Sequence, residues 1–146
     1  MMRNLKEQAE TIQLSIYSNI IFQLLFNHNQ LSVCKLLIFS YIIKKNRFLG
    51  GNIYTAKNSQ DIVFKGISFL TGDFDGFCNS VPYILKALHL LIKKEIVSSE
   101  NETVYLNVKL QKLDIAYEES NFLKKVIEES KLMSDRQFMK EVTYNV

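Results

Sequence analysis

The chain has 146 residues, of which 47% are hydrophobic and 23% charged, and its formal net charge at pH 7 is +3. This balance excludes a disordered chain and favours one domain with a real core and a short appendage. Because the only cysteines are Cys34 and Cys78, a disulfide-rich scaffold and a cysteine-based zinc site are also excluded.

Residues 1–14 are polar and lack the apolar region of a signal peptide, so we expect an arm or a frayed helix there. The spacing of isoleucine and leucine then predicts a helix over about 15–27, followed by a turn at "NHNQ". The next helix, about 31–45, is apolar on nearly every side, which indicates burial in the core or contact with a partner. The two apolar helices are separated by "NHNQ", and neither is long enough to span a bilayer. We therefore expect a cytoplasmic protein without a membrane partner.

A third helix is expected over about 59–70, where Asn58 and Asp61 have the spacing of a capping box. Its apolar residues recur at helical spacing, but Gly66 weakens the helix by about 1 kcal/mol relative to alanine.

Residues 71–80 are expected to form a loop that leads into a fourth helix over about 80–94. Ser80 is the expected N-cap, and Pro82 falls in the first turn, where its missing N–H does no harm.

Two short strands are expected after this helix, over about 95–98 and 103–108, with the turn at 99–102. The remaining residues, 113–146, have the pattern of an amphipathic helical tail, in which a second short helix begins at Ser134.

The sequence therefore predicts a mainly α fold with a small β-hairpin. We divide the chain into an N-terminal arm at 1–14, a winged-helix-like domain at 15–112 and a C-terminal helical tail at 113–146.

The residues that could carry chemistry are isolated. Asp73-Phe74-Asp75-Gly76 lacks the further ligands of an EF-hand loop, and an Asp/Gly turn before a helix explains it. His28 and His89 have no partner at metal-ligand or triad spacing, and no phosphate-binding loop or hydrolase motif is present. We therefore expect a protein that is not an enzyme, with no catalytic residue, no cofactor, no metal and no small-molecule substrate.

The charge of the chain is uneven. Residues 31–94 carry nine basic and three acidic groups, whereas residues 95–146 carry seven basic and ten acidic groups. A basic middle beside an acidic tail suits a polyanion or two different protein partners, and a solvated lysine surface is the alternative.

In a winged helix the fourth helix would be the recognition helix, and its Tyr83 and lysines would meet phosphates. Its middle has no Arg, Asn or Gln to read a base edge, and Glu100 and Glu102 at the wing tip would be repelled by a phosphate backbone. We expect non-specific contact with double-stranded DNA, or with an acidic partner surface, through a basic group formed by Lys44, Lys45, Arg47, Lys86, Lys93 and Lys94.

Short helices with this much apolar side chain also favour a permanent protein partner. The proposed contact surface is formed by the first two helices and by an apolar stripe on the tail. An ordinary intramolecular core is the alternative. The stripe consists of Phe122, Leu123, Val126 and Ile127.

The order "NIIFQLLF", a lysine-ended apolar helix, "CNSVPYILKALHLLIKKEIVSSENETVYLN" and a helical tail resembles the middle component of ABC three-component systems. These are bacterial conflict systems, and the Lamassu antiphage systems belong among them. The resemblance covers residues 15–130 as a pattern and is strongest over 77–107, although "KKE" stands where the family often has a glycine. The residues that fit the family's pattern there are Ala87, Leu88, Leu91 and Ile96.

The resemblance implies a non-catalytic adaptor or regulatory subunit, similar to the winged-helix accessory subunits of SMC complexes. Such a subunit would link an SMC-like ABC ATPase to a nuclease-type effector in an antiphage or anti-plasmid defence complex. The alternative is a stand-alone winged-helix transcriptional regulator or plasmid protein that binds DNA as a dimer.

Overall fold

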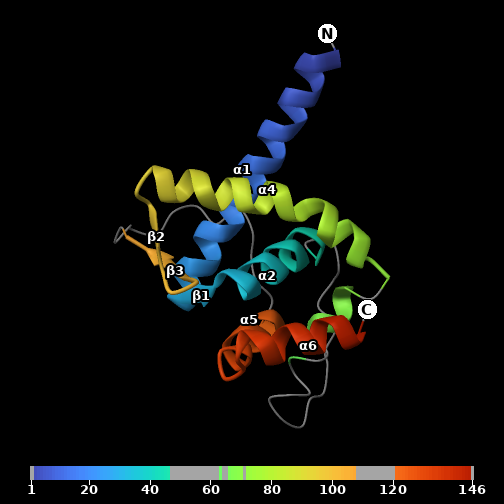
Figure 1. Ribbon diagram of the computed structural model, residues 1–146, viewed down its shortest axis with the longest axis vertical. Helices are drawn as coiled ribbons and strands as arrows, with labels where there is room; N and C mark the ends of the chain where they lie inside the picture. The colour runs from blue at the N-terminus through green and yellow to red at the C-terminus, as the bar shows by residue number, and fades with distance from the viewer. Residues whose placement is uncertain (1, 47–62, 64–65, 71, 108–120, 146) are drawn as a thin grey trace.

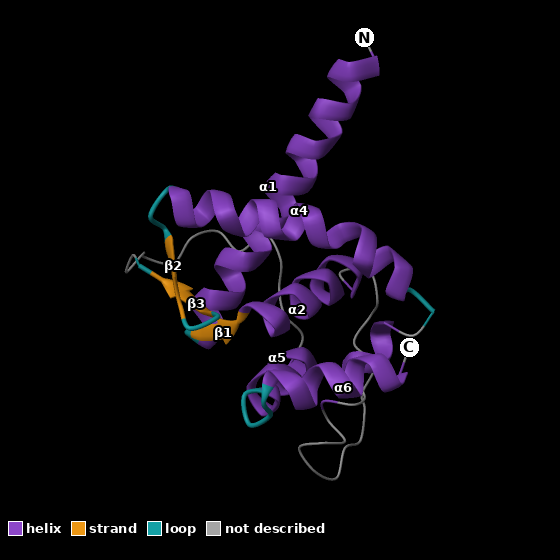
Figure 2. Cartoon of the chain, viewed as in Figure 1, coloured by secondary structure: helices purple, strands orange, loops and turns teal. Residues whose placement is uncertain are grey.

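A computed structural model describes residues 2–46, 63, 66–70, 72–107 and 121–145 of the chain. In this part the protein is mainly helical with one small three-stranded antiparallel sheet, as the sequence predicts (Figures 1 and 2). Along the chain, a helix, a strand and a second helix are followed by a short 3-10 helix, a long helix and a hairpin. Two further helices then pack on the domain. The elements are α1 (Met2–His28), β1 (Gln30–Ser32), α2 (Val33–Asn46), η1 (Ser68–Leu70), α4 (Phe74–Lys93), β2 (Val97–Glu100), β3 (Thr103–Leu106), α5 (Asn121–Ser130) and α6 (Asp135–Asn145).

The N-terminal helix is longer than expected. α1 is continuous from Met2, so residues 2–14 belong to the same helix as residues 15–28. Its first turns project away from the rest of the molecule (Figure 1), and residues 4–9 are all exposed. From Tyr17 onward the helix contributes to the core. The expected arm is therefore a helical extension of α1.

The second helix lies at the centre of the fold. α2 contacts α1 and α4 as well as α6, and the Phe39 ring lies 5.5 Å from the Phe138 ring of α6. Its apolar character on nearly every side is thus explained by neighbours within the same chain. The buried apolar residues of α2 are Leu36, Ile38, Phe39, Tyr41, Ile42 and Ile43.

The sheet contains a strand that the sequence analysis did not predict. β1 takes the last residue of the expected turn and the first two residues of the helix expected at 31–45, which therefore begins at Val33, and it pairs with β3 to give the order β1-β3-β2. Of its three residues only Leu31 is buried, so there is too little alternation to indicate a strand. Asn29, just before it, has a left-handed φ of 70° and ends α1 in the way that asparagine often does.

The hairpin turn is tighter than expected. Asn101 and Glu102 form a two-residue connection between β2 and β3, with φ values of 52° and 65°. Two successive left-handed residues are what the tightest hairpin turns require. As a result the first strand lies at Val97–Glu100 and not at 95–98, while the second starts at Thr103 as expected.

The fourth helix begins six residues earlier than expected. α4 starts at Phe74, so the segment "FDGFCNS" is helical and not a loop. Pro82 lies inside the helix, and the Ser80 hydroxyl donates to the Gly76 carbonyl at 2.9 Å instead of capping the N-terminus. Phe77 packs edge-on against the Tyr41 ring at 5.7 Å. We infer that such tertiary contacts offset the poor helix propensity of glycine and proline here.

The helical tail folds back onto the domain. Ser134 caps α6 as predicted, because its hydroxyl accepts a hydrogen bond from the Gln137 amide at 3.1 Å. Phe138 and Val142 of this helix are fully buried. For the third expected helix, Gly66 and Ile67 are helical and lead into η1, whereas Asn58 and Asp61 lie outside the described residues.

Candidate functional site: the outer face of α4

α4 divides cleanly into a buried and an exposed side. Its buried residues Phe77, Ile84, Ala87, Leu88 and Leu91 face the core. At 100° per residue, the exposed residues fall on the opposite side. They are Asp75, Cys78, Asn79, Pro82, Leu85, Lys86, His89, Leu90 and Lys93. We call this set the α4 outer face.

Two leucines border the α4 outer face. Leu85 is 42% exposed and Leu90 is 38% exposed, although leucine is usually buried. Lys86 and His89 lie between them on the helix surface. The face therefore carries polar side chains along its middle and an exposed leucine at each border, and Asn79, in the N-terminal half of the helix, is its one Arg, Asn or Gln residue that could read a base edge.

Lys86 is paired within the chain. Its Nζ lies 2.5 Å from Oε1 of Glu10 on α1. The hydrogen bond to Glu10, together with the carboxylate charge, raises the pKa of Lys86. The neighbouring carboxylate balances the lysine charge, which weakens the case for Lys86 as a phosphate contact.

Lys44 and Lys45 at the end of α2 are also engaged. Lys44 Nζ lies 4.9 Å from the centre of the Tyr17 ring, and Lys45 Nζ lies 3.9 Å from Oδ2 of Asp73. The Tyr41 hydroxyl donates to the same Asp73 oxygen at 2.6 Å, and burial together with this carboxylate raises the pKa of Tyr41. Asp73 thus serves a local polar contact.

The predicted basic group is not one surface. Lys45 lies beside Asp73, which immediately precedes α4, whereas Lys93 is the last residue of that helix. A helix of 20 residues is about 30 Å long, so the two ends cannot contact the same few phosphates. Lys93 and Lys94 are exposed and form no ion pair with another described residue, while Arg47 lies outside the described part of the chain.

The predicted apolar stripe of the tail is not an exposed partner surface. Leu123 is 3% exposed, and Val126 and Ile127 are fully buried, while Phe122 is half-buried against the same core. The alternative, an ordinary intramolecular core, is correct for this stripe.

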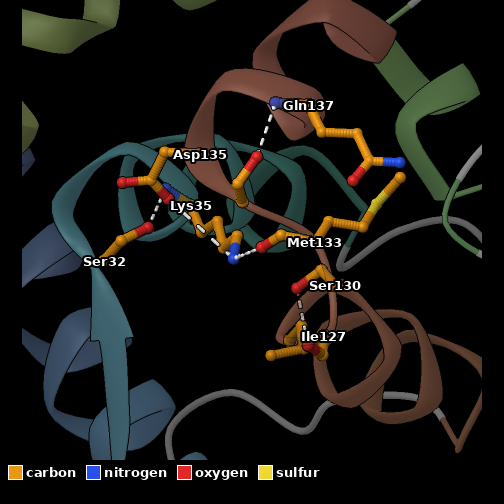
Figure 3. A network of polar contacts seen from close by, with 8 residues as sticks. Ser32, Lys35, Ile127, Ser130, Met133, Asp135 and Gln137 are labelled. Atoms are coloured by element: carbon orange, nitrogen blue, oxygen red, sulfur yellow. Dashed lines mark hydrogen bonds and ion pairs between the residues drawn. The ribbon is translucent and has the colours of Figure 1, made fainter.

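A polar network that the sequence analysis missed attaches the tail to α2 (Figure 3). The buried Lys35 Nζ donates to the Met133 carbonyl at 2.6 Å and lies 3.9 Å from Oδ1 of Asp135. Burial lowers the pKa of Lys35, although Asp135 opposes this shift. The sequence feature that could have indicated this network is the single lysine, Lys35, within the apolar segment "VCKLLIFS".

A second polar contact joins the tail to the end of α1. Lys131 donates to the His28 carbonyl, and Nδ1 of the buried His28 lies 3.3 Å from Oε2 of Glu128. Burial raises the pKa of Glu128, but hydrogen bonds with Lys131 and His28 outweigh it and leave this pKa below its usual value. His28 therefore has a structural position, whereas His89 lies exposed on the α4 outer face.

Within the described ranges, no group of three or more His, Cys, Asp or Glu side chains is arranged to hold a metal ion. None of the helices described in the structure is long and apolar enough to cross a membrane. Comparisons with protein-family models, curated proteins and solved structures give no match for this chain.

Proposed function

We propose that this chain is a non-catalytic adaptor subunit that docks on protein partners through the α4 outer face. The observation that carries the proposal is the exposure of Leu85 and Leu90 on the helix that a DNA-binding winged helix would place in the major groove. Leu85 and Leu90 border this polar face on its two sides, so a partner protein could make apolar contacts at both borders and polar contacts between them.

The charge of the same face supports protein contact over DNA reading. Lys86 is balanced by Glu10, and the lysines at the two ends of α4 are too far apart to act together. Glu102 lies in the hairpin turn and Glu100 directly precedes it, and both are exposed where they would oppose a phosphate backbone.

The resemblance over residues 77–107 suggests the setting of this adaptor. The partners would be an SMC-like ABC ATPase and a nuclease-type effector, joined in a cytoplasmic antiphage or anti-plasmid defence complex. Direct contact with DNA would then be weak and independent of sequence.

The first experiment is co-purification of the tagged chain from its native cells, with partners identified by mass spectrometry. We expect the wild type to retain a large coiled-coil ATPase and a second enzyme, and a Leu85→Glu/Leu90→Glu variant to lose at least one of them. Leu132→Glu is the matched control, because Leu132 is 76% exposed on the α5–α6 connection, away from α4.

Two outcomes would contradict the proposal. Equal recovery of the partners by the wild type and the double variant would show that the α4 outer face is not the docking surface. Recovery of the chain alone, enriched on one DNA segment, would favour the stand-alone regulator, which should bind its operator about a thousandfold or more tightly than random DNA.

A further inference from the structure

A second apolar surface lies on the projecting half of α1, outside the α4 outer face. Leu5 is 68% exposed and Ile12 is 58% exposed. Together with Ala9 they are spaced by four and then three residues, so they lie along one side of the helix. We call Leu5, Ala9 and Ile12 the α1 stripe.

The α1 stripe belongs to a segment with little support from the rest of the molecule. Residues 4–9 are all exposed, and the first tertiary ion pair described along the helix is that between Glu10 and Lys86. Helical segments of this length are marginal in water unless a packed face stabilises them. A helix that carries two exposed large aliphatic residues at coiled-coil spacing has the form of a surface that packs against another helix.

The charges beside the α1 stripe favour a second copy of the same chain as its partner. Lys6 directly follows Leu5 and Glu10 directly follows Ala9, so both lie on the same flank of the stripe. When two helices pack antiparallel, this flank of one copy meets the same flank of the other. With Leu5 opposite Ile12 of the second copy, Lys6 comes opposite Glu10 of that copy, and the reverse pair forms by symmetry.

A parallel arrangement has no such complementarity. In that case the flank carrying Lys6 and Glu10 would meet the opposite flank, where Asn4, Gln8 and Thr11 are uncharged. The small side chain of Ala9, near the middle of the stripe, lets two antiparallel backbones approach closely. Glu10 is already paired with Lys86, so its contact with Lys6 of the second copy would add to that ion pair and not replace it.

From these observations we infer that two copies of this chain associate through an antiparallel pairing of their α1 stripes, with reciprocal Lys6–Glu10 contacts. Because only one helix of each copy contributes, we expect an interface smaller than the roughly 1,600 Å² of a standard complex and a Kd on the order of 0.1–1 mM. In an assembly that holds two copies near each other, effective concentrations in the millimolar range make such a contact effective.

The test is analytical ultracentrifugation of the full chain at concentrations from about 10 to 500 µM, the upper end of which lies within the expected range of Kd, so that a measurable fraction of dimer should form. The wild type should pass from monomer toward dimer, and Leu5→Glu should stay monomeric. Leu132→Glu, a substitution of an equally exposed leucine elsewhere, should behave as the wild type.

The orientation is tested by the charges. Lys6→Glu and Glu10→Lys should each weaken association, whereas a 1:1 mixture of the two variants should associate more strongly than either alone. Lys86→Gln removes the ion pair between α1 and α4 but should leave the dimer in place, so it controls for local disturbance of Glu10.

A wild type that stays monomeric at the highest concentration would overturn the inference. The same result is expected if the α1 stripe binds a different protein and not a second copy. A mixture no stronger than its components would overturn the antiparallel pairing. Because none of these variants alters Leu85 or Leu90, failure here is distinguishable from failure of the proposed adaptor function.

Discussion

Gly66, just before η1, packs tightly against Val126 of α5. A Cβ atom at this position would lie 2.4 Å from Cγ1 and 2.8 Å from Cγ2 of Val126. The valine side chain is branched at Cβ and cannot easily rotate away, and Val126 is fully buried. The glycine that weakens the helix locally therefore permits close packing of the tail.

We expect Gly66→Ala to lower the free energy of unfolding by about 1–3 kcal/mol, as overpacked core substitutions do. Urea unfolding followed by circular dichroism measures this change. Val126→Ala should be less harmful in the Gly66→Ala background than in the wild type, because it removes the clashing methyl groups. If Gly66→Ala has no effect, or if the two substitutions are additive, the close approach does not limit packing.

Lys35 provides a pH-dependent test of the polar network. Burial lowers its pKa in the folded state, so between that value and the unfolded value of about 10.4 the unfolded chain binds more protons. This contribution makes the free energy of unfolding rise with pH through that window. Lys35→Met lacks the contribution, so its stability relative to the wild type should fall as pH is raised from about 7 to about 10. Parallel pH profiles for the two proteins would contradict the assignment.

At the level of elements, prediction from sequence succeeded where one pattern decided the structure. The strand predicted to begin at residue 103 is β3, and the helix predicted to begin at Ser134 is α6, which Ser134 caps. Prediction failed where tertiary contacts override local preference. At the start of α4, the contact between the rings of Phe77 and Tyr41 stabilises a helix that the local sequence does not favour. β1 was missed because three residues paired to a distant strand leave no local pattern.

The tail behaves as part of the domain and not as a detachable partner-binding segment. Phe138 is fully buried and its ring lies 5.5 Å from that of Phe39. We expect Phe138→Ala to lower the free energy of unfolding by about 3–5 kcal/mol, as for other buried aromatic residues. Thermal unfolding measures the effect, and Phe26→Ala, at a 41% exposed position, should change it much less. Similar losses in both variants would show that the tail adds little to the core.

Because the tail is part of the core, truncation of the chain after Lys112 would not test partner binding by the tail. Such a truncation would remove α5 and α6 and expose the side of α2 that they cover. We expect the shortened chain to unfold or aggregate, so a loss of partner binding in it would not assign binding to the tail. Point substitutions on the α4 outer face or the α1 stripe avoid this problem because they change exposed side chains.

At the scale of the whole molecule, the lysines that the sequence suggested on α4 are exposed, but they are not grouped with Lys44 and Lys45. Lys86, Lys93 and His89 do lie on its exposed side. Their partners come from distant parts of the chain, such as Glu10 for Lys86, and no spacing in the sequence reveals such a pair. The exposure of Leu85 and Leu90 depends on which side of α4 the other helices cover, and that is decided only by the assembled fold.

The distribution of charge over the molecule gives a final prediction about DNA. If the C-terminal end of α4 alone touches a duplex, Lys93 and Lys94 supply about two phosphate contacts, and the slope of log K against log salt should be near −2. Fluorescence anisotropy with several duplexes of unrelated sequence, each measured across a salt series, gives this slope. Lys93→Gln/Lys94→Gln should bring the slope close to zero, whereas Lys45→Gln should leave it unchanged, because Lys45 lies at the other end of the helix beside Asp73. A slope of about −6 or steeper, or strong preference for one sequence, would require a continuous basic surface and would favour the stand-alone regulator over the adaptor.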